Sequence, residues 1–175
     1  MEQYQNQDIV LILIYWVIKI YTGNQMKVVI QRVKSSKVEV NNKIIGQIDH
    51  GILVLIGIAV NDEKTDAEWI SNKVLNLRIF DDENGVMNKS LIDVKGNLLV
   101  ISQFTLIAST KKGNRPSYIN SAGHEIAIPL YEYFIKICEE KIGRKVSSGE
   151  FAADMKVSLI NDGPVTIVID SKVKD

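Results

Sequence analysis

Two short stretches of the chain, residues 27–33 (KVVIQRV) and 37–41 (KVEVN), alternate between apolar and polar residues, which is typical of strands with one buried face. A further strand is predicted at residues 43–48 (KIIGQI), after the turn signal Asn41-Asn42. The Lys-Ser-Ser segment at 34–36 separates the first two, and we expect it to form a turn. The first part of the fold is therefore predicted to be a series of neighbouring strands.

Two longer stretches, residues 51–60 (GILVLIGIAV) and 97–108 (NLLVISQFTLIA), are almost continuously apolar. Such a run predicts a strand that is buried on both faces. Residues 154–161 (DMKVSLIN) and 165–170 (VTIVID) predict the last two strands, which the pair Gly163-Pro164 separates.

Two segments show helical spacing instead. Residues 63–80 follow Asn61-Asp62, which can cap a helix, and place Ala67, Ile70, Val74 and Leu77 on one face. Residues 127–143 carry Pro129 near their start and Gly143 at their end. The pattern predicts an α+β fold, with mostly antiparallel, curled sheets covered by two helices.

Residues 1–25 do not fit this pattern. Ile9–Tyr21 is strongly apolar but contains Lys19, and it is shorter than the roughly 20 residues that a membrane span requires. The start of the chain is acidic, unlike a secretory signal. We expect Met26 to be the functional start and residues 1–25 to be a leader or a dispensable extension. An organelle or membrane anchor is the alternative.

Composition excludes several classes of chemistry. The formal net charge is zero, so any nucleic-acid binding requires a local basic patch. The single Cys138 excludes an intrachain disulfide and a multi-cysteine zinc site, and its helical context predicts a buried structural thiol. His50 and His124 have no sequence partner for a triad or a metal. We predict no metal and no cofactor.

Three polar features remain as candidates for function. Ser102, Gln103 and Thr105 interrupt an apolar run, and they can either line a site or form hydrogen bonds within the core. Lys112 and Arg115, with Lys111 beside them, lie in a stretch without any acidic residue from 94 to 124. This stretch can contact phosphates or can simply be a solvated loop.

The third feature is Gly163-Pro164, an unusual pair between two strands because proline donates no ladder hydrogen bond. The pair can form a hairpin turn. Alternatively it can form a fixed cis corner that directs backbone carbonyl groups toward a ligand.

These motifs closely resemble the D-aminoacyl-tRNA deacylase family. The likeness rests on SQFTL (102–106) and NDGPVT (161–166), together with VIQRV (29–33), GNRPSY (113–118) and FAADMKVSLINDGPVT (151–166). It extends over nearly all of the chain from Met26, and it implies that residues 26–175 form a single deacylase domain.

The resemblance implies a homodimeric, barrel-like fold that hydrolyses the ester between a D-amino acid and the 3′ end of tRNA. It also implies activity on glycyl-tRNA, a cytoplasmic location, and no DNA or membrane partner. The Gly163-Pro164 peptide would be cis and would reach into the partner subunit's site. There it would exclude L side chains, while Arg32 would fix its position.

The resemblance also implies roles for the remaining candidates. Ser102, Gln103, Phe104 and Thr105 would form the catalytic pocket. Substrate-binding roles are expected for Phe151 and Met155 near the adenine, and for Asn161, Val165, Lys112 and Arg115. Thr105 can be the nucleophile, although we favour attack by water with help from the ribose 2′-hydroxyl.

Two other classes of function stay open at this stage. One is a non-catalytic RNA-binding or scaffold module that keeps the fold. The other is a hydrolase that acts on a different ester or amide.

Overall fold

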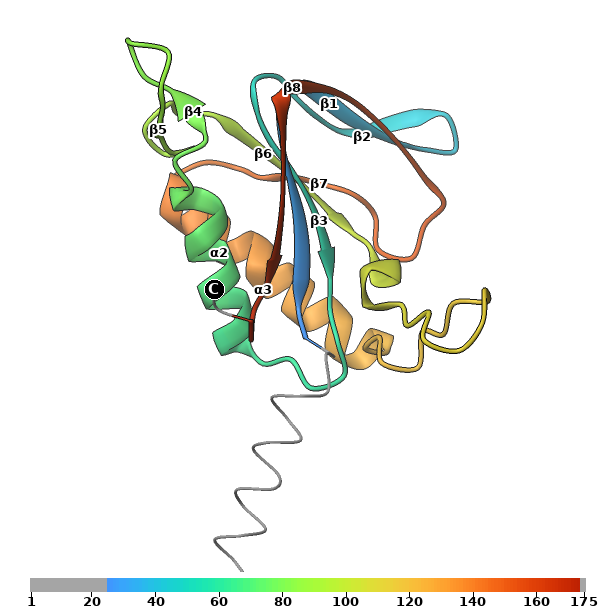
Figure 1. Cartoon of the computed structure of the whole chain (residues 1–175). Coiled ribbons are helices and arrows are strands. Elements are labelled where there is room, and N and C mark those ends of the chain that lie inside the picture. Colours follow the sequence, from blue (N-terminus) through green and yellow to red (C-terminus); the bar gives the residue numbers. More distant parts are fainter. Residues whose placement is uncertain (1–24, 174–175) are drawn as a thin grey trace, which may run out of the picture.

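The computed structural model describes residues 25–173, and its centre is a six-stranded sheet that curls into a nearly closed barrel (Figure 1). The strand order is β2-β1-β3-β6-β7, and β8 pairs with β1. β1 forms antiparallel pairs with β2, β3 and β8, whereas β3–β6 and β6–β7 are parallel. The strands are β1 (Lys27–Val40), β2 (Lys43–Ile48), β3 (Gly51–Gly57), β6 (Asn97–Ser102), β7 (Ser147–Ser148) and β8 (Met155–Asp170).

The turn predicted at residues 34–36 is wrong, because β1 runs through this segment as one strand. Its first half pairs with β3 as far as Val33, and its second half pairs with β2 from Ser36 onward. Shifts in the pairing with β8 fall on both sides of Val33. These irregularities bend the strand without reversing it, which lets β1 take part in both halves of the barrel.

The continuous apolar run of β3 reflects burial on both faces, as predicted. Ile52, Val54 and Ile56 belong to the core beneath the helices. Leu53 belongs to a second core inside the curl of the sheet, with residues of β1 and β6. The alternation is therefore present in the structure, although both sets of side chains are apolar.

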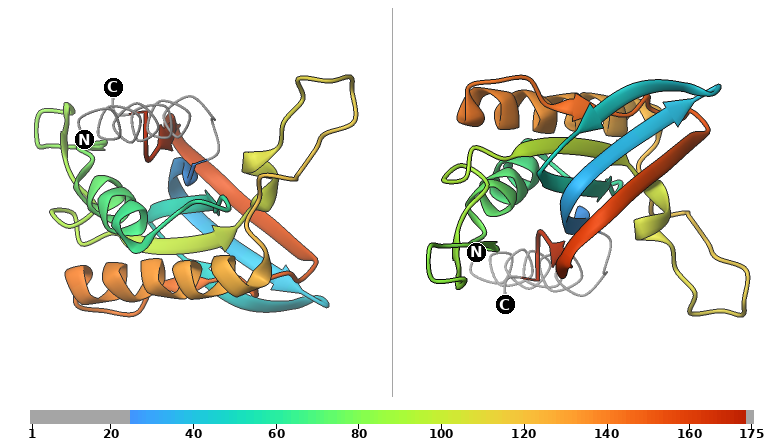
Figure 2. Two further views of the ribbon diagram at one scale, coloured as in Figure 1. Left: turned by 90° about the horizontal axis from the view of Figure 1, so that it is seen from below. Right: turned by 90° about the horizontal axis from the view of Figure 1, so that it is seen from above.

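The helices α2 (Lys64–Asn76) and α3 (His124–Ile142) cover the same face of the sheet (Figures 1 and 2). Ile70 of α2 and Phe134 of α3 are fully buried in the shared core. The expected cap at Asn61-Asp62 is wrong. The helix begins after Glu63, whose backbone N–H donates to the Asp66 carboxylate at 2.9 Å.

Cys138 is fully buried in α3, and burial raises the pKa of its thiol to about 12. It is therefore an unreactive structural thiol, as the sequence indicated.

The strand predicted over residues 97–108 ends earlier, at Ser102. The backbone N–H of Gln103 still donates to the Ile56 carbonyl of β3, and the chain then turns into the 3₁₀ helix η1 (Phe104–Ile107). A separate hairpin, β4 (Phe80–Asp81) and β5 (Met87–Lys89), lies beyond α2.

The hairpin interpretation of Gly163-Pro164 is also wrong. Both sides of this pair belong to β8 and pair with β1, from Asn161 opposite Val33 to Thr166 opposite Gln31. Residues 162–165 therefore form a bulge, and the peptide bond inside it is cis.

The leader expected over residues 1–25 lies, except for Gln25, outside the described residues. No helix within residues 25–173 is both long enough and apolar enough to cross a membrane.

Candidate active site

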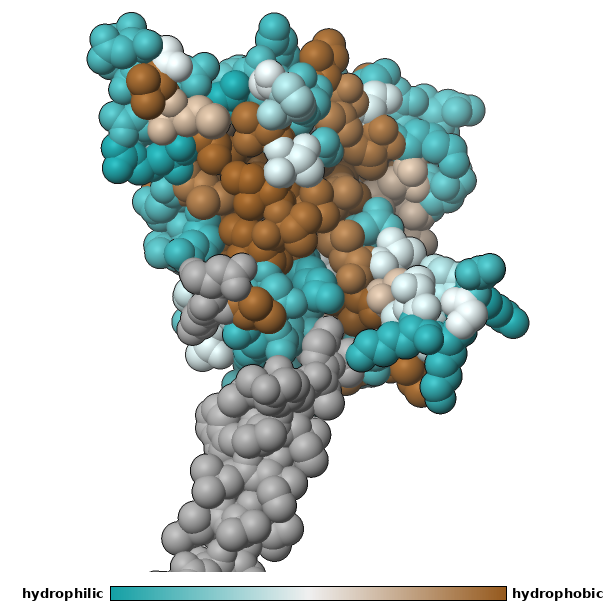
Figure 3. All heavy atoms as spheres, viewed as in Figure 1, coloured by the Kyte–Doolittle hydropathy of each residue, from teal (hydrophilic) through white to brown (hydrophobic). Residues whose placement is uncertain are grey.

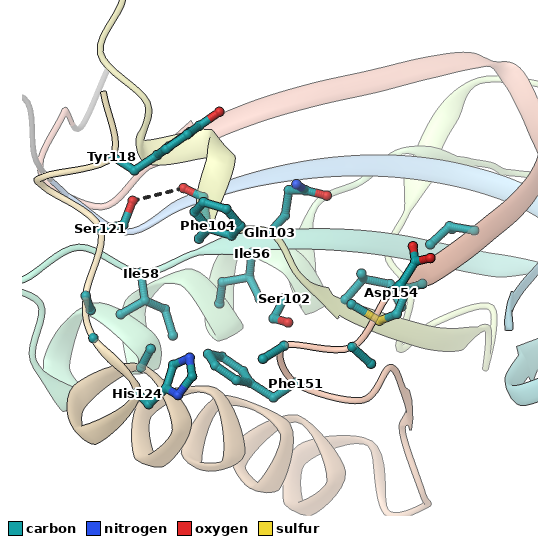
Figure 4. Close-up of a pocket in the computed structure, with 18 residues that line it drawn as sticks. Ile56, Ile58, Ser102, Gln103, Phe104, Tyr118, Ser121, His124, Phe151 and Asp154 are labelled. Atoms are coloured by element: carbon teal, nitrogen blue, oxygen red, sulfur yellow. Dashed lines mark hydrogen bonds between the residues drawn. The ribbon is translucent and has the colours of Figure 1, made fainter. Parts of the chain in front are cut away.

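A cavity of about 590 Å³ lies between the end of β6 and the start of α3 (Figure 4). Four chain segments form its wall: the end of β3, the β6–η1 junction, the approach to α3 with its first turn, and the segment that leads into β8. The residues are Ile56, Ile58, Ile101, Ser102, Gln103, Phe104, Tyr118, Ser121, Ala122, Gly123, His124, Ala127, Phe151, Ala152, Ala153, Asp154, Met155 and Val157.

The predicted catalytic segment only partly lines this cavity. Ser102, Gln103 and Phe104 are in its wall, whereas Thr105 is not. The Thr105 hydroxyl instead accepts a hydrogen bond of 2.5 Å from the Gln103 side-chain amide. This arrangement follows from the turn of the chain into η1, which directs residues 104 and 105 differently from a strand.

Phe104 is held by two residues of the loop before α3. The Ser121 hydroxyl donates to the Phe104 carbonyl at 3.2 Å, and the rings of Phe104 and Tyr118 meet edge to face at 5.0 Å (Figure 4). The first hydrogen bond of η1 runs from the Leu106 N–H to the Gln103 carbonyl. The N–H groups of Phe104 and Thr105 therefore have no acceptor within the helix and can serve a ligand oxygen.

Phe151 lies at the opposite end of the cavity, between two aromatic rings. His124 meets it edge to face at 5.5 Å, and Tyr131 lies 6.0 Å away. The Tyr131 hydroxyl donates to the Val100 carbonyl at 2.8 Å, and burial raises its pKa above the ordinary value. Phe151 is thus a supported apolar surface that suits a planar base, and Met155 also lines the cavity.

Several residues of the wall cannot be recognised from the sequence. His124 has no partner nearby in the chain, because Phe151, the ring that it contacts, is distant in sequence. Ser121 and Asp154 gave no signal either, since their role depends on loops that fold over the cavity. His50 does not line the cavity and instead contacts Phe80 edge to face.

The residues predicted around Gly163-Pro164 lie outside this cavity within one chain. Arg32 is mostly buried, and its Nε donates to the Asp162 carbonyl at 2.9 Å. Its Nη1 donates to the Ile79 carbonyl at 2.6 Å. Arg32 therefore links the bulge to the segment that follows α2.

Asn161 and Val165, for which substrate-binding roles are expected, close the bulge within one chain. The Asn161 amide donates to the carbonyl groups of Arg32 and Val165, and its oxygen accepts from the Val165 N–H at 3.2 Å. Gly163 is exposed and has a φ of +141°. An added Cβ there would lie 2.8 Å from Val165 Cγ2, so the bulge has no room for a side chain.

Lys112 and Arg115 also lie away from the cavity, at the exposed end of a loop that projects from the body (Figure 2). Ser109 and Ser117 close the base of this loop with two backbone hydrogen bonds of 2.8 and 2.9 Å. The loop starts just after η1 and returns to Tyr118, so it is attached directly to the cavity wall.

Among the described residues, no cluster of three or more His, Cys, Asp or Glu side chains could hold a metal ion.

Known proteins resemble this chain over most of its length. The family model described as D-Tyr-tRNA(Tyr) deacylase matches residues 29–170. A protein of Flavobacterium psychrophilum named D-aminoacyl-tRNA deacylase is 57% identical over 150 residues, which cover 86% of this chain and 100% of that protein. A protein of Clostridium tetani with the same name is 61% identical over 147 residues, or 84% of this chain and 98% of that protein.

Solved structures agree with these matches. One titled "c-Myc DNA Unwinding Element Binding Protein" is 37% identical, with a TM-score of 0.77, and covers 82% of this chain and 97% of its own. Another, titled as a probable eukaryotic D-amino acid tRNA deacylase, has the same fold, with a TM-score of 0.73 at 17% identity and coverage of 83% and 99%. These findings confirm the resemblance predicted from the motifs, and the chain belongs to the D-Tyr-tRNA(Tyr) deacylase family.

Proposed function

We propose that this chain hydrolyses the ester bond of D-aminoacyl-tRNA and releases the free D-amino acid and tRNA. The observation that carries the proposal is the cavity, whose wall holds Phe104, the first residue of η1, and an aromatic surface at Phe151. The names of the relatives support the same activity.

In this proposal the terminal adenine packs on Phe151 and Met155, and the ester carbonyl lies near Phe104. The N–H groups at the start of η1 then stabilise the negative charge that develops on the carbonyl oxygen. Water attacks the carbonyl carbon, and the ribose 2′-hydroxyl assists the proton transfer. The position of Thr105, outside the wall and bonded to Gln103, favours this route over attack by Thr105.

The chiral filter is Gly163-Pro164 of a partner subunit. Arg32 and Asn161 hold the bulge around this pair from the inside, and Gly163 and Pro164 themselves are exposed. Such a bulge can enter another chain's cavity, where its backbone atoms would occupy the space that an L side chain needs. Glycine has no side chain to reject, so glycyl-tRNA is also a substrate.

Apolar surface on β8 supports the homodimer. Ile160 and Val168 are 58% and 68% exposed, and Leu159 is also exposed. Figure 3 shows a broad apolar area on the face that β8 crosses. An exposed area of this kind indicates an interface, and a second copy would bring its own bulge to the same face.

The projecting loop binds the phosphates of the tRNA acceptor end. Lys111, Lys112 and Arg115 are exposed on it, and no acidic residue lies between 94 and 124 to neutralise them. Its attachment beside the cavity suits a substrate whose ester lies in the cavity and whose backbone passes outside.

Parallel hydrolysis of D-Tyr-tRNA and L-Tyr-tRNA by the wild-type protein tests the proposal. We expect rapid loss of the D ester and persistence of the L ester. Loss of neither ester, with tRNA still bound, would favour a binding module. If a free D-tyrosyl ester is cleaved as fast as D-Tyr-tRNA, and added tRNA does not slow that cleavage, the protein is a hydrolase of a different class.

A further inference from the structure

An oxygen-rich cluster surrounds the backbone nitrogen of Met26, at the base of β1. Met26 is fully buried, and its N–H donates to Asp62 Oδ1 at 2.9 Å. The other oxygen of Asp62 accepts the Ala59 N–H at 2.6 Å. Asp62 is only 7% exposed, so its carboxyl group has little access to water.

The cluster has more acceptors than donors. Asp66 is also buried, but Lys172 pairs with it, the Nζ lying 2.5 Å from Oδ1. Within residues 25–173, no basic side chain forms an ion pair with Asp62. Two backbone N–H groups bind the Asp62 carboxyl group, but no side-chain cation is paired with it, and a charged carboxylate at this depth would be stabilised by one.

Two further oxygens near Met26 lack a hydrogen-bond donor. Among the described residues, two buried side-chain polar atoms have no hydrogen-bond partner, and they are Gln25 Oε1 and Ser171 Oγ. Gln25 directly precedes Met26, and the Ser171 N–H donates to the Met26 carbonyl. Both residues are therefore next to Met26, Gln25 along the chain and Ser171 through this backbone hydrogen bond.

We propose that the functional chain begins at Met26 and that its free α-ammonium group forms an ion pair with Asp62. A peptide nitrogen offers one donor at this place, whereas an ammonium group offers three donors and a positive charge. Cleavage or initiation at Met26 also removes Gln25 and its unsatisfied oxygen. The inference is independent of the proposed catalytic activity.

Two other observations agree with this start. The relative from Flavobacterium psychrophilum is aligned over its whole length, yet it covers only 86% of this chain. Burial raises the pKa of Asp62 to about 7 when residue 26 carries a peptide nitrogen, and an adjacent ammonium would oppose that rise.

The first test is the N-terminus of the protein made from its own gene, with its natural upstream region. Intact mass and N-terminal peptide mass spectrometry should both give a chain that starts at Met26. A mature chain that starts at Met1, or at any residue other than Met26, overturns the proposal.

The second test addresses the ion pair itself. Methionine labelled with ¹³C allows the α-amine of Met26 to be titrated by NMR in the mature protein. We expect its pKa to lie above the ordinary value of about 8, and Asp62→Asn to lower it by about one unit or more. Asp154→Asn is the matched control, because Asp154 is exposed and pairs only with the neighbouring Lys156. An amine pKa that Asp62→Asn leaves unchanged overturns the ion pair.

Discussion

The guanidinium Nε of Arg32 donates a hydrogen bond of 2.9 Å to the carbonyl oxygen of Asp162, the residue before Gly163-Pro164. Arg32 is the residue of β1 that lies opposite the bulge, between the pairs Gln31–Thr166 and Val33–Asn161. A second hydrogen bond, to the Ile79 carbonyl, anchors the side chain in the core, and the carboxylates of Asp81 and Asp162 lie within ion-pair distance. The position of the bulge thus depends on the Arg32 guanidinium group, which binds the carbonyl groups of Asp162 and Ile79 at the same time.

Replacement of Arg32 by lysine should weaken discrimination between D and L substrates. Lysine offers a point charge and cannot hold both carbonyls in this geometry, so the bulge becomes less well fixed. The loss of about one hydrogen bond to a charged group, roughly 1.5 kcal/mol, predicts about a tenfold rise in the relative rate on L-Tyr-tRNA.

Lys34→Ala is the control for this substitution. Lys34 is largely exposed and approaches only the Asp162 carboxylate, at 3.8 Å. If Arg32→Lys and Lys34→Ala change the D/L ratio equally, the role of the carbonyl contact is wrong.

Removal of the Ser121 hydroxyl should lower kcat more than it raises KM. Ser121 holds the carbonyl of Phe104, whose N–H group faces the developing charge in the proposed mechanism. The net value of one hydrogen bond predicts a two- to tenfold fall in kcat for Ser121→Ala, and Ser121→Thr should restore it. Steady-state kinetics on D-Tyr-tRNA measure both parameters.

Ser147→Ala is matched to this change, since Ser147 donates to the Gln47 carbonyl at 3.0 Å and does not line the active-site cavity. An equal fall in kcat in that variant would indicate a general loss of stability.

Thr105→Val should retain most of the activity, within about threefold, because Thr105 lies outside the cavity wall. A tRNA with a 2′-deoxy terminal adenosine should instead react slowly with the wild-type protein. Single-turnover hydrolysis of both substrates by both proteins separates the two routes. The opposite pattern would make Thr105 the nucleophile.

Lys112→Ala and Arg115→Ala should each raise KM and reduce its dependence on salt. A residue that neutralises one phosphate contributes about 0.7–0.9 to the slope of log affinity against log salt concentration. Lys136→Ala on α3 is a suitable control, as Lys136 is exposed and pairs only weakly with Glu140. If the salt dependence of KM is the same in all three variants, the loop does not contact tRNA.

In a chain that retains residues 1–25, Asp62 should lower the free energy of unfolding as the pH rises from about 4 to about 7. Its folded pKa is raised from 3.8 to about 7, chiefly by burial, so the folded state holds a proton that the unfolded state has released. Its contribution is fully present below the unfolded pKa and is lost as pH rises through 7. Asp66 adds to the rise, and Lys172 opposes it.

Asp62→Asn should flatten this part of the profile, as measured by urea unfolding at several pH values. An unchanged slope would show that Asp62 is not protonated in the folded chain.

Periodicity along the chain was enough to predict several local elements, and the motifs were enough to predict the family. The two-sided burial of β3 follows from a run of neighbouring apolar residues, and the face of α2 follows from Ala67, Ile70 and Val74 at helical spacing. Gly143 ends α3 in the left-handed conformation that glycine favours. These features depend on residues that are close together in the chain, so periodicity is enough to predict them.

The points where the strands bend and end depend on contacts between distant segments. The apolar run 97–108 gave no sign that β6 stops at Ser102, because the stop depends on the last hydrogen bond to Ile56 of β3. The continuity of β1 through residues 34–36 depends equally on β2 and β8 as neighbours. Pairing partners, and not propensity, set these boundaries.

The arrangement of the site also depends on contacts between residues that are distant in sequence. His124 and Phe151 meet across the cavity, and Arg32 reaches Asp162 across a separation of 130 residues. The Asn161 amide holds the bulge together because it donates to carbonyl groups on both of its sides, those of Arg32 and Val165. Such contacts depend on strand register and loop path, which arise from the summed packing of the whole chain and leave no periodic mark in the sequence.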